Sequence, residues 1–224
     1  MIKAIIFDLD DTLFDSTALA EAARKEACNA MVNAGIPDSV ENSYKSLLRI
    51  VKKYGSNDSR HFDRLCNSYG IKNRPDIIAS GVVAYHNMKF SKLHMFPRSR
   101  FTLTNLMKQR YKLALVTNGI ISKQWEKITR LKIKYLFDEI MISEKQPKSK
   151  LLKKALSKLN VNPSEILSVG NRIDAELKDS KKLGMKTVRI LQGKYSKMKP
   201  KGKLDKPDFN IKNISEIIGI LKKI

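Results

Sequence analysis

The chain has 224 residues, of which 42% are hydrophobic and 7% aromatic, and this is enough apolar material to bury a core in one domain or two small ones. Its formal net charge is +22, from 44 lysines and arginines against 22 aspartates and glutamates. The composition excludes a chain dominated by disorder. No apolar run approaches the roughly 18 residues that a membrane span needs, so no membrane partner is expected.

The positive charge is spread along the chain and is enriched at residues 145–158 and 194–206. Neither stretch interleaves aromatic with basic residues, as a nucleic-acid platform does. We therefore expect a solvated basic surface, with attraction of anionic substrates as the second interpretation and a nucleic-acid site as the least favoured one. By contrast, residues 1–15 hold four aspartates and one lysine. An acidic cluster in a basic protein indicates a specific role.

The cysteine pattern bears on the compartment. Cys28 and Cys66 lie in helix-like segments without the spacing of a metal site, which predicts buried free thiols. The start of the chain lacks the pattern of a signal peptide. Both observations lead us to expect a cytoplasmic protein.

Residues 2–7 (IKAIIF) predict a short buried strand that leads directly into the acidic loop. Four helical segments follow, several ending at a glycine, and they span 18–34, 39–54, 58–69 and 75–90. Helices are then predicted at 98–109, 121–130, 149–159, 173–183 and 214–221. They alternate with strands predicted at 112–117, 139–142, 166–170, 186–190 and 208–211.

This alternation predicts an α/β fold, with a Rossmann-like doubly wound parallel sheet and an inserted four-helix cap domain. The core domain is expected to comprise residues 1–16 and 96–224, and the cap residues 17–95. Three strands end in polar loops, at residues 8–10, 117–119 and 170–172. Because ligands of open α/β sheets bind at the carboxyl ends of the strands, these loops are expected to converge in one crevice.

The acidic loop reads DLDDTL over residues 8–13. Carboxylates as close as Asp8 and Asp10 repel one another unless a cation or a proton compensates. A hard divalent metal with oxygen ligands is the natural compensation. A bare Asp-x-Asp can also be an Asx-type turn, but the full string after an apolar strand is more specific.

With this string the chain resembles the haloacid dehalogenase (HAD) superfamily, and the likeness runs from end to end, including residues 1–16, 125–128 and 184–188. It looks closest to archaeal HAD phosphatases of small phosphorylated metabolites. The resemblance implies a Mg²⁺-dependent phosphatase that works through an aspartyl phosphate. Asp10 favours this over dehalogenation, since only phosphate ester cleavage needs an acid to protonate a leaving alcohol.

By this resemblance, Asp8 is the expected nucleophile and Asp10 the general acid and base. Mg²⁺ is expected on the Asp8 carboxylate and the backbone carbonyl of Asp10. Loop amides around Leu9 and Asn118, with the Thr117 hydroxyl, are expected to hold the phosphoryl oxygens.

Two later motifs depart from the family pattern. Where the family has a lysine before a proline, this chain has Gln146, which carries no charge. Lys148 is the expected phosphate-binding substitute, with Lys145 and Lys123 as alternatives, since a lysine stem reaches from several backbone positions.

The other departure is Asn171, which stands where the family has an aspartate. We expect Asn171 to bind the metal more weakly than a carboxylate would. Glu176 keeps the second acid of the motif, and it and Gln146 are expected to support the site without touching the substrate. Because one positive and one negative charge are lost together, activity is the favoured prediction. The alternative is a weak or inactive HAD-fold protein that binds a phosphorylated ligand or a partner.

The cap is expected to close over a small phosphorylated metabolite and exclude water. It offers five polar candidates for contact with the substrate. They are Tyr44, His61, Tyr85, His86 and Lys89.

Overall fold

A computed structural model describes all 224 residues. The chain divides into two compact units: Met1–Thr17 with His94–Ile224, and Ala18–Leu93. None of the helices combines the length and apolar character needed to cross a bilayer.

The first unit is built on a six-stranded sheet in the order β3-β2-β1-β4-β5-β6, with every neighbouring pair parallel. The strands are β1 (Ala4–Phe7), β2 (Lys112–Asn118), β3 (Glu139–Ser143), β4 (Ile166–Gly170), β5 (Lys186–Ile190) and β6 (Phe209–Ile211). The central strand β1 is buried throughout, as its unbroken apolar sequence predicts. The predicted α/β fold with a doubly wound parallel sheet is confirmed.

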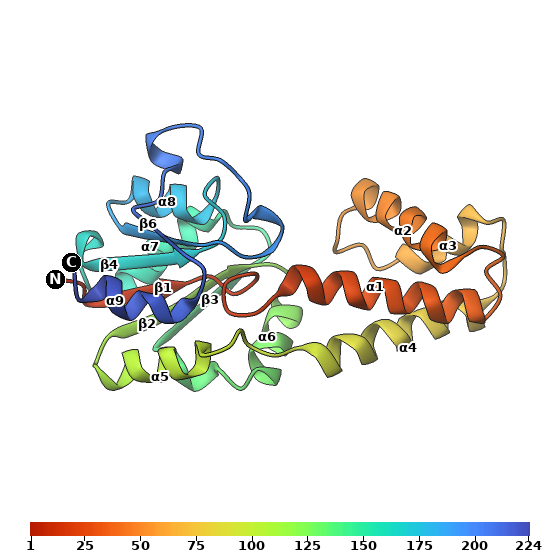
Figure 1. Cartoon of the computed structure of the whole chain (residues 1–224), viewed down its shortest axis with the longest axis horizontal. Helices are drawn as coiled ribbons and strands as arrows, with labels where there is room; N and C mark the ends of the chain where they lie inside the picture. Colours follow the sequence, from red (N-terminus) through yellow and green to blue (C-terminus); the bar gives the residue numbers. More distant parts are fainter. The chain divides into compact units, whose positions relative to one another are not determined.

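Helices cover both faces of this sheet. They are α5 (Ser99–Lys108), α6 (Ile121–Arg130), α7 (Lys148–Leu159), α8 (Glu176–Lys182) and α9 (Ile217–Leu221). Strands β2 and β3 are added on one side of β1, and β4 to β6 on the other. Because crossovers between parallel strands are right-handed, α5 and α6 lie on one face and α7 and α8 on the opposite face; Figure 1 shows α5 and α8 on opposite sides of the strands.

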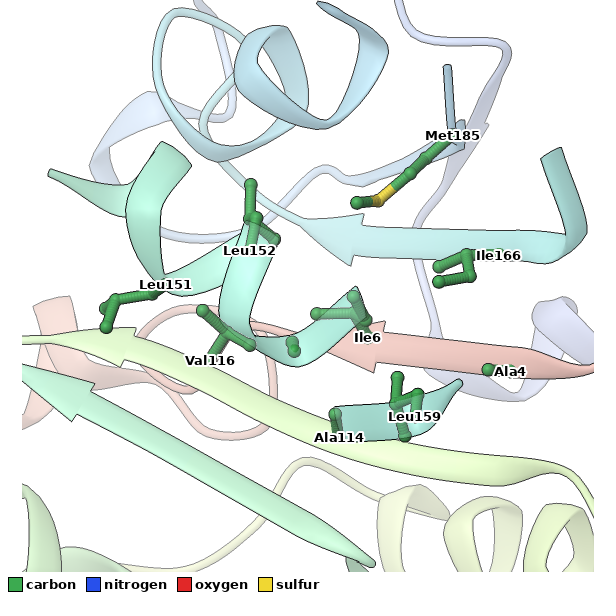
Figure 2. Close-up of a cluster of buried hydrophobic side chains, with 10 residues drawn as sticks. Ala4, Ile6, Ala114, Val116, Leu151, Leu152, Leu159, Ile166 and Met185 are labelled. Atoms are coloured by element: carbon green, nitrogen blue, oxygen red, sulfur yellow. The ribbon is translucent and has the colours of Figure 1, made fainter. Parts of the chain in front are cut away.

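The face under α7 is packed by one hydrophobic cluster (Figure 2). The sheet side contributes Ala4, Ile6, Ala114, Val116, Ile166 and Met185, and α7 contributes Leu151, Leu152, Ala155 and Leu159. Alternate residues of a strand point to opposite faces, so Ala4 and Ile6 share this cluster while Ile5 and Phe7 point the other way. The packed sheet fixes where each strand ends.

The second unit is helical. It contains most of α1 (Ser16–Asn33) together with α2 (Val40–Tyr54), α3 (His61–Ser68) and α4 (Pro75–Lys92). The Ser39 side chain caps α2 by accepting a hydrogen bond from the Asn42 amide. The unit has its own buried cluster, which includes Cys28, Met31 and Leu47.

Most predicted elements lie within a few residues of the observed ones, but α8 begins at Glu176 and not at residue 173. Ala175 has φ −126° and ψ −103°, which is not helical, so residues 171–175 form a turn at the end of β4. The chain also forms four short 3₁₀ turns that the sequence did not predict, at Lys134–Leu136, Pro163–Glu165, Gly193–Tyr195 and Lys203–Asp205. The helix predicted at 214–221 starts with a fifth 3₁₀ turn, Ile214–Glu216.

The α7 cluster predicts a measurable packing contribution. Leu152 is 1% exposed, so Leu152→Ala should lower the free energy of unfolding by about 2–5 kcal/mol through lost burial and a cavity. Leu204 is 44% exposed, and Leu204→Ala serves as the matched control, with an expected change of under about 1 kcal/mol. Guanidinium unfolding followed by circular dichroism measures both, and equal effects would contradict this account of the core.

Candidate active site

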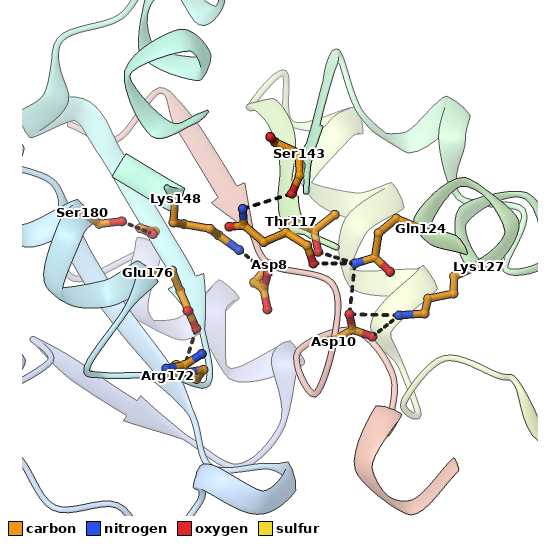
Figure 3. A network of polar contacts seen from close by, with 12 residues as sticks. Asp8, Asp10, Thr117, Gln124, Lys127, Ser143, Lys148, Arg172, Glu176 and Ser180 are labelled. Atoms are coloured by element: carbon orange, nitrogen blue, oxygen red, sulfur yellow. Dashed lines mark hydrogen bonds and ion pairs between the residues drawn. The ribbon is translucent and has the colours of Figure 1, made fainter. Parts of the chain in front are cut away.

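Polar residues follow the carboxyl ends of four adjacent strands. Asp8 follows β1, Thr117 and Asn118 end β2, Ser143 ends β3, and Asn171 follows β4. Because all these strands are parallel, their carboxyl ends meet at one edge of the sheet, where Figure 3 shows several groups of polar contacts close together. The structure therefore brings the three predicted loops together.

The loop after β1 turns sharply through Asp11, which has a left-handed φ of 54°. Aspartate tolerates this conformation better than most residues. The Asp11 carboxylate accepts hydrogen bonds from the Ser16 hydroxyl and from both the amide and the hydroxyl of Thr17, at 2.6–2.8 Å. Gly193 packs against it so closely that a Cβ there would lie 2.1 Å from Asp11 Oδ2. Asp11 thus holds the loop and the start of α1 in place.

Asp8 is paired with Lys148, the first residue of α7. Lys148 Nζ lies 2.5 Å from Asp8 Oδ1, and both side chains are only 11% exposed. Burial raises the pKa of Asp8, while the charge and hydrogen bond of Lys148 act in the opposite direction. Of the three lysines considered from the sequence, Lys148 is the one brought to the aspartate, while Lys145 and Lys123 are exposed.

Glu176 is the second buried carboxylate and is 5% exposed. Its Oε1 accepts a hydrogen bond from the Arg172 amide at 2.6 Å, which the turn before α8 makes possible. Burial, with the nearby charge of Asp8, raises the pKa of Glu176 to about 7. A Cβ at position 170 would lie 2.7 Å from Glu176 Oε1, so Gly170 leaves the space that this side chain fills.

Asn171 is 3% exposed, and its amide nitrogen donates to the carbonyl of Gln192 at 3.5 Å. Gln146 acts through its backbone: its amide donates to the Ser143 hydroxyl at 2.9 Å and its carbonyl accepts from Asn118 Nδ2 at 2.9 Å. The side-chain oxygen of Gln146 is buried without a protein partner. Gln146 therefore braces the ends of β2 and β3.

The residues predicted to hold phosphate lie at the same edge. Burial raises the pKa of Asp8, and a hydrogen bond from the Leu9 amide to the Asp8 carboxylate offsets a small part of that rise. Asn118 uses its side-chain amide on Ser143 and Gln146. Thr117 is 1% exposed, and its hydroxyl accepts from Gln124 Nε2 at 2.7 Å, so the hydroxyl proton is available to donate to an anion.

Two residues that sequence reasoning missed contact Asp10. Lys127 Nζ lies 2.7 Å from Asp10 Oδ1, and Gln124 Nε2 lies 3.0 Å from Asp10 Oδ2 (Figure 3). Both come from α6, the helix that follows Gly119. A Cβ at Gly119 would lie 3.2 Å from Gln124, so this glycine makes room for the glutamine. The sequence feature that could have indicated these two residues is their spacing of three, just after the polar loop, which puts both on one face of the helix.

The five polar candidates of the helical unit have contacts within that unit. His61 hydrogen bonds with the carbonyl of Gly55 at 2.8 Å. Tyr85 packs edge-on against Phe62 and His86, and Lys89 Nζ lies 5.4 Å from the centre of the Tyr85 ring. Tyr44 packs against the buried cluster of the unit. Each of the five therefore has a contact inside its own unit.

Comparison with known proteins identifies the family. The family model described as haloacid dehalogenase-like hydrolase matches residues 5–190. The chain is 42% identical to the glyceraldehyde 3-phosphate phosphatase of Methanopyrus kandleri, covering 100% of this chain and 99% of that protein. It is 41% identical to the protein of the same name from Pyrococcus furiosus, covering 99% and 94%.

Solved structures agree on the fold. The YfnB protein of Bacillus subtilis, bound to magnesium, superposes with a TM-score of 0.68 at 18% identity, with 98% of each chain covered. The family predicted from the opening loop is confirmed, and the predicted enzyme class agrees with the names of the relatives. The chain belongs to the haloacid dehalogenase-like hydrolase family.

Proposed function

We propose that this chain is a magnesium-dependent phosphatase that transfers the phosphoryl group of a small metabolite to Asp8 and then hydrolyses the aspartyl phosphate. The observation that carries the proposal is the pairing of two carboxylates from one loop with two different cations. Asp8 is buried against Lys148, whereas the Asp10 side chain is 31% exposed beside Lys127. The buried Asp8 carboxylate suits the role of nucleophile, and the more exposed Asp10 carboxylate can exchange protons with substrate and water.

In the first step an Asp8 oxygen attacks phosphorus and the bond to the leaving oxygen breaks. Asp10 gives its proton to that oxygen, so that an alcohol leaves. In the second step the ionised Asp10 takes a proton from water, whose oxygen attacks phosphorus and releases phosphate from Asp8. The Thr117 hydroxyl and the Lys148 ammonium are the groups best placed to bind the phosphoryl oxygens.

The donor set fits a magnesium ion. Asp8 and Glu176 are two buried carboxylates that share one ammonium, Lys148, so the burial of their charge is incompletely compensated. No group of three acidic, histidine or cysteine side chains is placed to hold a metal. Magnesium, however, is commonly bound by one or two carboxylates and several waters, and the Asp8 carboxylate, the Asp10 carbonyl and Asn171 would suffice. The ion would supply positive charge between the anionic nucleophile and the anionic phosphate.

We propose a triose phosphate as the substrate class. The support is the name of the relatives, glyceraldehyde 3-phosphate phosphatase, to which this chain is similar over almost the full length of both chains.

We also propose a reducing, cytoplasmic compartment. Cys28 and Cys66 are buried free thiols, and burial raises the pKa of Cys28 to about 12, which keeps it in the unreactive thiol form.

The function is tested by phosphate release from a panel that contains triose phosphates, other sugar phosphates and p-nitrophenyl phosphate, in millimolar MgCl₂. Asp8→Asn should lower turnover by at least about 10³-fold, because the amide cannot form the aspartyl phosphate. Asp76→Asn, in the helical unit, is the matched control and should keep activity. A wild-type protein that shows no turnover above Asp8→Asn would contradict the proposal and favour a weak or inactive family member. The neutral Asn171, where a carboxylate is expected, is the observation behind that alternative.

Metal binding is tested separately at Asn171. Asn171→Asp should tighten Mg²⁺ binding by about tenfold, because a carboxylate replaces a neutral amide oxygen. The readouts are calorimetric Mg²⁺ affinity and the Mg²⁺ concentration for half-maximal activity. Asn210→Asp makes the same change on an exposed part of β6 and should leave both unchanged. An unaltered or weaker affinity in Asn171→Asp would place residue 171 outside the metal site.

The buried charge of Glu176 predicts a pH effect on stability in metal-free protein. A carboxyl whose pKa is higher in the folded state, here about 7 against 4.5, loses its favourable contribution as pH rises between these values. Glu176→Gln keeps the acceptor for the Arg172 amide and removes the charge. In EDTA the variant should match wild type near pH 4.5 and be more stable at pH 8 by on the order of 2–3 kcal/mol. Chemical unfolding at both pH values measures this, and a variant that is less stable at pH 8 would refute it.

A further inference from the structure

Helix α6 presents two polar side chains to the loop that carries Asp10. Gln124 and Lys127 are three residues apart and therefore lie on the same face of the helix. Gln124 is 2% exposed, and the Lys127 side chain is 20% exposed. Burying an amide is costly unless it is hydrogen bonded, so the position of Gln124 has to be explained by its partners.

Those partners are Asp10 and the end of β2. Gln124 Nε2 lies 3.0 Å from Asp10 Oδ2, 2.7 Å from Thr117 Oγ1 and 3.2 Å from the Asn118 carbonyl. Lys127 Nζ contacts both oxygens of Asp10, at 2.7 and 3.0 Å. Figure 3 shows the Gln124 amide joined by dashed lines to both Thr117 and Asp10, with the Lys127 ammonium beside the same carboxylate.

Such an arrangement restricts Asp10 in two ways. With both oxygens held, the ionised carboxylate resists rotation about its last bond. When Oδ1 carries the proton, Oδ2 still accepts from both Gln124 and Lys127. Because Gln124 also holds Thr117, the distance between Asp10 and the proposed phosphate-binding hydroxyl is set by one side chain. A displacement of about 1 Å at a reacting group can cost about 10²-fold in rate.

We propose that Gln124 and Lys127 are positioning residues that fix the Asp10 carboxyl relative to the phosphoryl group bound at Thr117. This rests on the proposed function, in which Asp10 protonates the leaving oxygen. The competing explanation is that the contacts only stabilise the packing of α6 against the loop.

The leaving group separates the two explanations. An alkyl phosphate leaves as an alkoxide and needs protonation, whereas p-nitrophenyl phosphate leaves as a stable phenolate and needs little. The ratio kcat/KM reports the steps up to phosphoryl transfer to Asp8, and it excludes the later hydrolysis in which Asp10 is a base for every substrate. A positioning defect therefore lowers kcat/KM for the alkyl substrate selectively, and a general structural defect lowers both alike.

The experiment compares wild type, Lys127→Met and Lys127→Arg on p-nitrophenyl phosphate and on the alkyl phosphate that wild type turns over fastest in the panel. Lys127→Met should lower kcat/KM by about 10–100-fold for the alkyl phosphate and by less than about threefold for p-nitrophenyl phosphate. Lys127→Arg keeps a cation that can pair with Asp10 and should recover most of the loss. Arg130→Met, at the exposed end of the same helix, is the control and should change kcat/KM for neither substrate.

Equal losses on both substrates, or no loss on either, would overturn the positioning role while leaving the phosphatase proposal intact. A wild type no faster than Asp8→Asn on every substrate would instead overturn both proposals. Unfolding curves of the Lys127 variants show whether a loss is due to misfolding. If Lys127→Met is unstable, Gln124→Met, which removes the other contact to Asp10, is assayed on the same two substrates. A loss confined to the alkyl phosphate supports the positioning role, and equal losses on both substrates overturn it.

Discussion

A carboxylate buried at the end of the central strand has to be balanced by nearby positive charge, and Asp8 is such a carboxylate. Its partner Lys148 comes from the start of α7, so the sheet edge and this helix must be held together for the charge to be tolerated. The hydrophobic cluster under α7 supplies that connection, since Leu151 and Leu152 follow Lys148 within the first turns of the helix. Packing of the core thus determines the electrostatics of the site.

The winding of the sheet explains why the two aspartates of one loop have different cations. Lys127 lies on α6 and Lys148 on α7, and these helices cover opposite faces because the chain reverses its direction of winding between β3 and β4. The loop after β1 lies at the edge of the sheet between these two helices, so a side chain from either helix can contact it. Asp8 and Asp10, two residues apart, can therefore be held in different environments.

The sequence predicted the alternation of strands and helices well because buried strands and amphipathic helices differ in period. It also located Asp8, Asp10, Thr117 and Asn171 at strand ends. The family resemblance gave Asp10 its expected role but none to the adjacent Asp11. The left-handed turn and the hydrogen bonds of Asp11 show that it anchors the loop. Contacts such as that of Lys127 with Asp10 join residues 117 positions apart, and their pairing depends on tertiary placement.

The structure gives a local reason why residue 146, where the resemblance leads us to expect a lysine, can be a glutamine. Residue 146 lies before α7 and braces two strand ends with its backbone, a role that any residue other than proline could fill. Lys148 stands two residues later, at the first position of α7, and its long stem carries the ammonium to Asp8. The positive charge beside the proposed nucleophile is thus retained although the residue at the motif position has changed. The ammonium of Lys148 approaches Asp8 from a backbone position two residues further along the chain than the motif position. This difference argues for an altered rate with the same chemistry.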